Sequence, residues 1–533
     1  MGFKRTNIPY EETGFFSKVF IDYLEGDSKL KSFYEYPPTL SAFADALKKM
    51  GNYEYPRKLL STTLKEYYTK NASGATSEAT LKNIQKLEDK NCFTVTTGQQ
   101  LCLFTGPLYF VFKIITAISL AEKLNKEYPA NHFVPVFWMA SEDHDFAEIN
   151  HAKLFGKKIE WNAENMGGPV GRMPLTSLSS TLEDLYTLVH DEDLRKLISQ
   201  SYSSEKTLGQ ATFSFVNALF GKYGLVIVEP DNANLKQVFS PVVTDEVLNG
   251  TSYKLVSDTD KKLADIGIEP QVHAREINLF YMDEHGRNRI EKKADKFEVL
   301  NTGKTFTANE ITEAVKQSPG NFSPNALLRP VYQQSILPSA AYIGGPAEVA
   351  YWLQLKSIFD HYKIPFPILM SRNCALIMDK TAVQKINKLN ISVKDIFKDT
   401  ESLVKELLKR VDGVPDFEKE SAELKDLYTS IGKQVGGIDP TLVASTQAEL
   451  QKQFNALKTL KTKLMRVRKQ QEETSISRIR KVKETLFPNG ALQERTENFI
   501  PFYLEYGASL FDMLKENFDP FDFSMQILSE IEE

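Results

Sequence analysis

Short apolar runs without polar alternation recur along the first 375 residues of the chain. They are FTVTT (Phe93–Thr97), FVPVFWMA (Phe133–Ala140), GLVIVEP (Gly224–Pro230) and PFPILMS (Pro365–Ser371). Strands that are buried on both faces of a parallel sheet have this pattern. Helical patterns separate the runs, as in PLYFVFKIITAISLAEKLNKEY after Gly106. The alternation of strand and helix predicts a doubly wound α/β core.

Two stretches interrupt this core. NAENMGGPVGRMPL (Asn162–Leu175) is glycine-rich and hairpin-like, and FYMDEHGRNRIEKK (Phe280–Lys293) predicts two strands around a turn at His285–Gly286. We therefore divide the chain into seven segments. They are core parts at 1–160, 206–249 and 328–385, insertions at 161–205 and 250–327, a helical coiled-coil domain at 386–500, and a C-terminal segment at 501–533 that returns to the core.

The pattern changes after about residue 385. Apolar residues there follow the 3-4-3 spacing of a heptad seam, at Leu450, Leu457, Leu460, Leu464 and Val467. Residues 386–431 have helical patterns of their own, and the glycines and proline of 436–440 break the chain between the two. An antiparallel coiled coil fits best, with an ordinary helical bundle as the alternative. We expect a second protomer to cover part of the apolar stripe, which predicts a homodimer through these helices.

Composition places the chain among globular proteins. Of its 533 residues, 42% are hydrophobic and 25% are charged, and the net charge is −5. The three cysteines form no CxxC pair, which argues against a disulfide framework and against a thiolate zinc site. No apolar run approaches the roughly 18 residues of a membrane span, and the first residues lack the apolar region of a signal peptide. We expect a cytoplasmic protein of two or more domains.

Two Gly-Pro sequences follow predicted strands. Gly106-Pro107 follows a strand that ends at Thr97, and Gly344-Gly345-Pro346 follows one that ends near Ile343. Free backbone N–H groups and the helix dipole make such helix starts candidate anion sites, although many Gly-Pro helix starts bind nothing. Neither matches a P-loop or GxGxxG, which argues against an ordinary P-loop kinase or a dinucleotide dehydrogenase. We predict that both starts face one cleft and hold an anion such as the phosphates of ATP.

Four ionisable residues, Glu142, Asp143, His144 and Asp145, directly follow the apolar run that ends at Ala140. At the carboxyl end of a parallel strand they would lie on the ligand side of the sheet. They could hold Mg²⁺ with phosphates, bind a substrate amine, or remove a proton; His144 titrates near neutrality and is the first choice for the base. The alternative is an exposed turn that caps a helix over FAEINHAKLF. A zinc site would need ligands from elsewhere, so we predict no protein-held metal.

Other candidates follow predicted strands or lie in polar segments between them. PQVHAREINLF contains His273 and Arg275, and ILMSRN places Ser371 and Arg372 just past the last apolar strand. The third segment, FSPNALLRPVYQQSILP, contributes Arg329, Tyr332 and Gln333. Arginine binds carboxylate or phosphate through two parallel hydrogen bonds, but each of these arginines could equally form a structural ion pair.

Five blocks of the sequence carry a resemblance to a known family. They are TTGQQLCLFTGPLY, VPVFWMASEDHDFAEIN, QVHAREINLFY, LRPVYQQSILPSAAYIGGPAEVAYWLQLK and NFIPFYLEYG. The chain resembles the BshC family of bacillithiol biosynthesis over nearly its whole length. The resemblance implies a Rossmann-like nucleotidylyl-transferase core with inserted connecting-peptide subdomains and a C-terminal α-helical coiled coil. The family's proposed activity is the addition of cysteine to glucosaminyl malate.

The implied core is similar to that of class I aminoacyl-tRNA synthetases, but two signatures differ. The place of the His-Ile-Gly-His signature reads TGPLY (Thr105–Tyr109), with no histidine, and the lysines of the second signature are absent near Met370–Arg372. Phosphate stabilisation would then fall to backbone amides, Lys113, Arg329 or Arg372. Because an amide does not form from a free carboxylate at useful rates in water, we expect ATP, with Mg²⁺, to activate the cysteine through an acyl-adenylate or an acyl phosphate.

Together these arguments predict three groups of site residues. The catalytic group is His144, Asp143, Glu142 and Lys113. The substrate-binding group is Gln99, Gln100, Tyr109, Asp145, His273, Arg275, Arg329, Tyr332, Gln333 and Glu348. The nucleotide-binding group is Thr105, Gly106, Gly344, Gly345, Ser371 and Arg372. The expected partners are cysteine and glucosaminyl malate, with no membrane and no nucleic acid.

A function of another class competes with the ligase. Residues 441–486 hold 11 Lys and Arg against 4 Glu, a net charge of +7. A basic coiled-coil arm of this kind could bind RNA phosphates or act as a scaffold. The arm lacks interleaved aromatic residues, and a basic helix face is more often only solvated, which favours the ligase.

Overall fold

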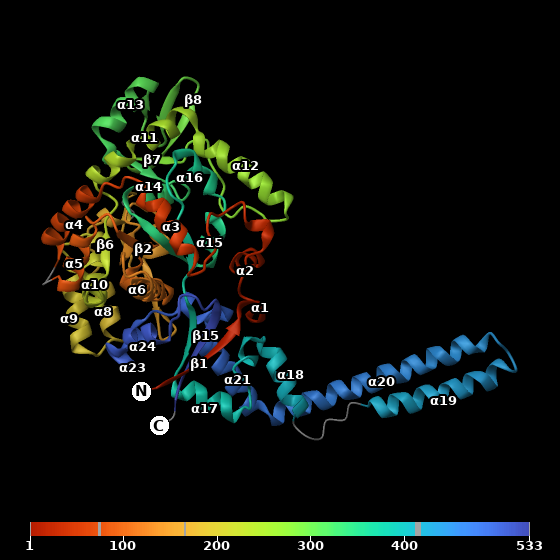
Figure 1. Ribbon diagram of the computed structural model, residues 1–533. Coiled ribbons are helices and arrows are strands. Elements are labelled where there is room, and N and C mark those ends of the chain that lie inside the picture. Colours follow the sequence, from red (N-terminus) through yellow and green to blue (C-terminus); the bar gives the residue numbers. More distant parts are fainter. Residues whose placement is uncertain (1, 73–75, 165–166, 411–416, 532–533) are drawn as a thin grey trace. The chain divides into compact units, whose positions relative to one another are not determined.

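The computed structural model describes residues 2–72, 76–164, 167–410 and 417–531 (Figure 1). The chain divides into two compact units. The larger consists of Asn7–Leu376 and Ala491–Leu528, and the smaller consists of Ile377–Gly490 with the two ends of the chain. No helix among the described residues is long and apolar enough to cross a membrane.

A five-stranded parallel sheet forms the centre of the larger unit. Its order is β13-β12-β2-β3-β6, and every neighbouring pair is parallel. The strands are β2 (Cys92–Gln99), β3 (His132–Met139), β6 (Val226–Val228), β12 (Ser339–Gly344) and β13 (Ile368–Ser371). The predicted α/β core is therefore confirmed, and each of the four apolar runs overlaps one of these strands: β2, β3, β6 or β13.

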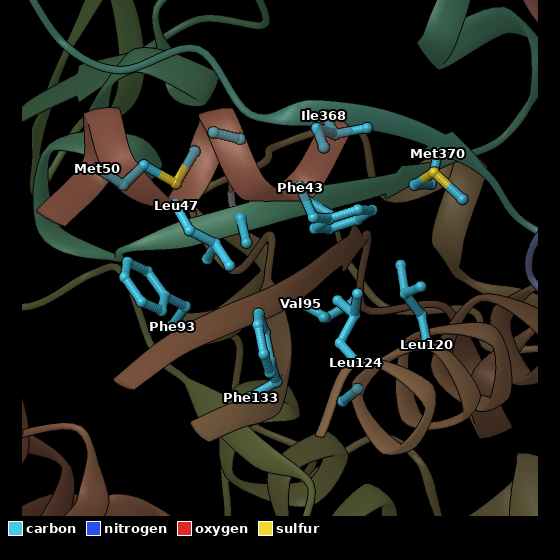
Figure 2. Close-up of a cluster of buried hydrophobic side chains, with 14 of the residues drawn as sticks. Phe43, Leu47, Met50, Phe93, Val95, Leu120, Leu124, Phe133, Ile368 and Met370 are labelled. Carbon is cyan, nitrogen blue, oxygen red and sulfur yellow. The ribbon is translucent and has the colours of Figure 1, made fainter. Parts of the chain in front are cut away.

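The sheet is buried because apolar side chains cover it. Figure 2 shows Phe43, Leu47 and Met50 of α3 (Ala42–Gly51) near Phe93 and Val95 of β2. Leu120 and Leu124 of α6 (Tyr109–Glu127) belong to the same cluster. Each fully buried side chain of this size contributes roughly 1.5–3 kcal/mol, so the cluster fixes the sheet on which the site is built.

Further helices complete the larger unit. They are α1 (Tyr10–Thr13), α2 (Lys18–Glu25), α4 (Arg57–Asn71), α5 (Glu78–Lys86), α7 (Phe146–Ile149), α8 (Ser179–Tyr186), α9 (Glu192–Ser201), α10 (Leu208–Phe220), α11 (Ala233–Asn249), α12 (Thr251–Asp265), α13 (Ala308–Gln317), α14 (Arg329–Ile336), α15 (Pro346–Trp352), α16 (Lys356–Tyr362), α22 (Gln493–Thr496), α23 (Ile500–Tyr506) and α24 (Ser509–Asn517).

A second sheet of the larger unit is antiparallel, in the order β10-β9-β8-β7-β11. Its strands are β7 (Leu279–Asp283), β8 (Gly286–Lys293), β9 (Lys296–Val299), β10 (Lys304–Phe306) and β11 (Phe322–Pro324). The pairing of Asp283 with Gly286 confirms the hairpin predicted within Phe280–Lys293, although its turn is Glu284–His285 rather than His285–Gly286.

The hairpin predicted at Asn162–Leu175 does not form among the described residues of that segment. A hairpin lies earlier, in β4 (His151–Leu154) and β5 (Lys157–Glu160), joined by Phe155 and Gly156. Both turn residues have positive φ, 53° and 75°, as the tight hairpin turn requires. Residues 167–175 contain instead a short 3₁₀ helix, Val170–Arg172, and Asn165 and Met166 lie outside the described residues.

The smaller unit is helical. Its helices are α17 (Lys380–Lys388), α18 (Thr400–Arg410), α19 (Glu418–Gly436), α20 (Leu442–Gln471) and α21 (Glu473–Leu486). Helices α19 and α20 run side by side and reverse direction at residues 437–441, which confirms the antiparallel coiled coil (Figure 1).

A third sheet, in the order β1-β15-β14, consists of β1 (Phe3–Pro9), β15 (Ser524–Glu530) and β14 (Cys374–Met378).

Candidate active site

A cavity of about 1120 Å³ lies at the carboxyl edge of the parallel sheet. Residues at or just past the ends of all five strands line it: Gly98, Gln99 and Gln100 at β2, Ala140, Glu142, Asp143 and His144 after β3, Pro230 after β6, Gly345 after β12, and Arg372 after β13. The hairpin β7–β8 supplies further lining, including Phe280, Arg287 and Arg289. Ligands of open α/β sheets bind at this edge, and the volume suits more than one small molecule.

A buried ion pair joins α6 to α15 at one side of the cavity. Lys113 pairs with Glu348 and also donates to Gly98 O and Gln99 Oε1, both at 2.9 Å. Glu348 in turn accepts from the Tyr342 hydroxyl at 2.8 Å. Burial by itself would raise the pKa of Glu348, but Lys113 and these hydrogen bonds outweigh it, and the pKa lies below its usual value. Glu348 is therefore held as a carboxylate.

The two helix starts differ from the predicted phosphate sites. The Gly345 N–H donates to Glu348 at 2.9 Å, so the protein's own carboxylate occupies the start of α15. Helix α6 begins at Tyr109 rather than at Pro107, and the loop before it is buried, with Asn498 donating to Gly106 O at 2.6 Å. Gly345 and Tyr109 line the cavity, whereas Thr105, Gly106 and Gly344 do not.

Glu142 is buried and forms an ion pair with Lys236 of α11. Lys236 lies 3.3 Å from Asp231, which also accepts from Arg172 at 2.7 and 2.9 Å. Burial raises the pKa of Glu142, although Lys236 opposes this. The charge of Glu142 is thus balanced by Lys236, which does not line the cavity, in a network that the sequence patterns did not indicate.

The segment just past β3 rests on this network through Ser141, whose hydroxyl donates to Glu229. Burial, together with Asp231, raises the pKa of Glu229 to about 8. The backbone of Gly171 also donates to Ser141 O at 2.8 Å. These contacts fix the position of the ionisable residues that follow.

The ionisable residues past β3 divide between the cavity and a helix cap. Asp143 lines the cavity and accepts from Gln100 Nε2 at 2.6 Å. Asp145 does not line it; its carboxylate accepts from Glu148 N at 3.3 Å and caps α7. This helix is a single turn, because His151–Leu154 continues as β4 rather than as helix. The capping alternative is thus confirmed for Asp145 only.

His144 meets an arginine from the inserted hairpin. Nη1 of Arg287 lies 2.9 Å from Nδ1 of His144, and both side chains contact the ring of Phe280. Burial and Arg287 together lower the pKa of His144. The sequence patterns predicted this hairpin but missed Arg287, because alternation along a strand does not show which sheet face meets the ligand cavity.

The two predicted arginines of the core differ in their partners. Arg372 is buried and donates to Glu494 at 2.6 Å, so its charge is balanced. Arg329 lines the cavity and donates to Gln333 Oε1 at 2.9 Å and to the Tyr342 hydroxyl at 3.4 Å, both neutral groups. Among the described residues, no carboxylate is hydrogen-bonded to Arg329, which therefore brings a positive charge to the cavity.

The remaining predicted residues fall into two groups. His273 and Arg275 line the cavity. Tyr332, Gln333 and Ser371 do not, because their side chains are buried and bonded within the protein: Tyr332 donates to Pro230 O at 2.9 Å, and Ser371 donates to Arg372 O at 2.9 Å. Lining residues absent from the sequence prediction include Trp138, Arg287, Arg289, Lys292, Asn325, Tyr342, Tyr351 and Arg495. Within the described part of the chain, no three His, Cys, Asp or Glu side chains are grouped to hold a metal ion.

Comparison with known proteins covers the whole chain. Residues 3–373 match the family described as bacillithiol biosynthesis BshC, N-terminal Rossmann-like domain, and residues 375–530 match the BshC C-terminal coiled-coil domain.

Two relatives named "Putative cysteine ligase BshC" are each 39% identical: that of Flavobacterium johnsoniae over 98% of this chain and 99% of its own, and that of Flavobacterium psychrophilum over 98% of both. A relative of the same name from Cytophaga hutchinsonii is 35% identical over 98% of this chain and 99% of its own. A solved structure described as a "putative arginyl t-RNA synthetase" from Campylobacter jejuni matches over 86% of this chain and 98% of its own at 8% identity, but its TM-score of 0.20 supports no comparison. The chain belongs to the BshC family of bacillithiol biosynthesis and is a ligase of that family.

Proposed function

We propose that this protein is an ATP-dependent cysteine ligase that forms an amide between the carboxylate of cysteine and the amine of glucosaminyl malate. Family membership over the full chain carries the proposal. A cavity of about 1120 Å³ at the carboxyl edge of the sheet supports it, because it has room for two small substrates. The RNA-binding alternative rests only on the charge of the coiled-coil arm.

The charges around the cavity suit an amino acid. Arg329 brings a positive charge whose hydrogen-bond partners are neutral, and Asp143 brings a negative charge whose partner Gln100 is neutral. A cysteine carboxylate would pair with Arg329, and the ammonium of cysteine or of the amino sugar would pair with Asp143. The attacking amine must lose a proton, and the Asp143 carboxylate lines the same cavity.

ATP would activate the carboxylate, since carboxylate and amine do not condense in water at useful rates. Its phosphates fit the arginines of the cavity wall better than the helix starts, because Glu348 already occupies the start of α15. The candidates are Arg275, Arg289 and Arg495. Mg²⁺ would be held mainly by the phosphates and water, as it commonly is beside nucleotides.

We also propose that the coiled coil joins two copies of the chain in the cytoplasm, where ATP is made. Both α19 and α20 expose apolar side chains: Leu427 is 55% exposed, Leu460 47% and Val467 53%. Burial of such side chains against a second copy would remove them from water.

The test is amide formation by the full-length protein given cysteine, glucosaminyl malate and MgATP, with the product thiol identified by mass spectrometry. Asp143→Asn and Arg329→Gln should each lower the rate on the order of 10²-fold, as loss of a well-placed charge contact in a closed site does. The matched control is Asp145→Asn, which changes a carboxylate two residues away that lies outside the cavity lining. Absence of a cysteine-dependent product from the unmodified protein would refute the proposed function.

A further inference from the structure

The contact between His144 and Arg287 constrains where the proton of the imidazole lies. A guanidinium group has only donors, so the nitrogen that it contacts must present a lone pair. Nη1 of Arg287 is 2.9 Å from Nδ1 of His144. The neutral ring must then carry its proton on Nε2.

Asp143 is the competing partner for the same ring nitrogen. Its Oδ1 lies 3.7 Å from Nδ1 of His144, which is too long for a hydrogen bond. That oxygen instead accepts from the backbone N–H of His144 at 2.7 Å, and the other carboxylate oxygen accepts from Gln100. The geometry therefore favours the arginine as the partner of Nδ1.

Arg287 is itself held in place by three further contacts. Its Nε donates to Ser323 Oγ at 3.1 Å, and its Nη2 donates to Pro324 O at 3.0 Å. The guanidinium carbon also lies 3.9 Å from the centre of the Phe280 ring, against which His144 packs. An arginine fixed in this way leaves Nη1 aimed at one point, the Nδ1 lone pair.

The other end of the imidazole is open to a ligand. His144 lines the cavity with its side chain 44% exposed. Among the residues that the structure describes, the hydrogen bonds of His144 involve its Nδ1 and its backbone, and none involves Nε2. Asp145 and Arg289 are the other charged groups that act on this ring, and they act only through space.

We infer that Arg287 is a positioning residue that fixes His144 as the neutral imidazole with its proton on Nε2, so that His144 donates a hydrogen bond to an oxygen of the bound substrate. This inference rests on the proposed function and deepens it. With Nδ1 engaged and Nε2 protonated, His144 has no free lone pair and does not serve as the general base. The proton acceptor for the amine is then a carboxylate. Asp143 lines the cavity next to His144 and is the candidate, because the neighbouring Glu142 is already paired with Lys236.

The first experiment reads the tautomer without substrate. The full-length protein is prepared with ring-¹⁵N,¹³C-labelled histidine, and His144 is assigned among the seven histidines by the signal lost in His144→Gln. We expect the Nε2–H tautomer at pH 7, and its loss in Arg287→Met. Arg289→Met is the matched control, since Arg289 lies on the same strand and should leave the tautomer unchanged. A proton on Nδ1, or an imidazolium, at pH 7 would overturn the inference.

The second experiment separates a donor from a base. The amide nitrogen of glutamine can take the place of Nε2–H but does not titrate, so His144→Gln should keep the rate within about tenfold, while His144→Ala and His144→Asn should lose about 10²–10³-fold. If His144 is the base, His144→Gln should instead fall as far as His144→Ala, on the order of 10²–10⁴. Without product from the unmodified protein the ligase proposal fails, whereas the tautomer measurement still decides the role of Arg287.

Discussion

The carboxylate of Glu348 lies 2.9 Å from the backbone nitrogen of Gly345, so the start of α15 already holds a negative charge that belongs to the protein. The same carboxylate neutralises Lys113, whose side chain is 4% exposed. One side chain thus satisfies both a helix start and a buried ammonium group. A substrate phosphate at this point would meet repulsion rather than an open anion site.

Glu348→Gln should therefore destabilise the fold, because it leaves the Lys113 ammonium buried without a counter-charge. We expect a loss on the order of 3 kcal/mol in the free energy of unfolding, at the low end for a broken buried pair since Glu348 is 25% exposed. Urea unfolding followed by circular dichroism measures it. The double variant Lys113→Met/Glu348→Gln should recover part of the loss; equal stability of the single variant and the unmodified protein would show that the pair is not needed.

Glu229 predicts a pH dependence of stability. Its pKa is raised by burial to about 8 in the folded state, against 4.5 for an unperturbed glutamate. An acid with a raised pKa in the folded state stabilises the fold at pH values below its pKa in the unfolded chain. That contribution is lost as the pH rises through its pKa in the folded protein. Glu229→Gln, which keeps the shape of the neutral acid, should match the unmodified protein near pH 4 and exceed it at pH 9 by at least about 1 kcal/mol. A difference in unfolding free energy that does not vary with pH would contradict this.

Gly171→Ala should displace the segment that carries the ionisable residues past β3. A Cβ at Gly171 would lie 2.5 Å from Cβ of Ser141 and 2.9 Å from its carbonyl oxygen, closer than the backbone can allow. We expect a loss of about 1–3 kcal/mol by thermal or urea unfolding, with lower ligase activity. Gly51→Ala is the control, since a Cβ there meets nothing within 4 Å and a helical alanine should be neutral or slightly stabilising. Equal effects of the two substitutions would mean that the Gly171 contact does not hold the segment.

The proposed dimer makes a prediction about mass in solution. The double variant Leu460→Glu/Val467→Glu replaces two exposed apolar side chains of α20 with charged ones. We expect it to convert a dimer to a monomer, measured by sedimentation velocity at micromolar concentration. Gln453→Glu adds a charge at an exposed polar position of the same helix and should leave the dimer intact. An unmodified protein that sediments as a monomer would end the proposal.

Much of the framework could be predicted from local patterns. The runs that became β2, β3 and β13 lack polar alternation, and the parallel sheet follows from burial on both faces. The sequence also predicts that Glu142, Asp143 and His144 lie at the cavity edge of the sheet, because they directly follow β3. Arg287 was missed because its role depends on a contact between residues 143 positions apart, and no local pattern encodes that contact.

The sequence patterns also could not show which group each site residue binds. A glycine before a proline looks the same whether the next carboxylate caps the helix or a ligand does, and only the fold shows that Glu348 takes the Gly345 N–H. The sequence likewise offered no means of telling Arg329 from Arg372. In the structure they have different partners: Arg372 donates to the carboxylate of Glu494, whereas Arg329 donates to neutral groups.

Strand β12 lies between β13 and β2 in the parallel sheet, yet it enters the chain long after β2. The side chains of Thr94 and Ser339, which hydrogen-bond across the two strands, are 245 residues apart. At a synthesis rate of 5–20 residues per second, β2 leaves the ribosome roughly 12–50 s before its neighbour exists. During that time one edge of β2 has no strand to pair with, and open edges of this kind recruit other chains. Soluble production of this protein should therefore depend on chaperones that shield the nascent chain, and fragments that end before Ser339 should aggregate.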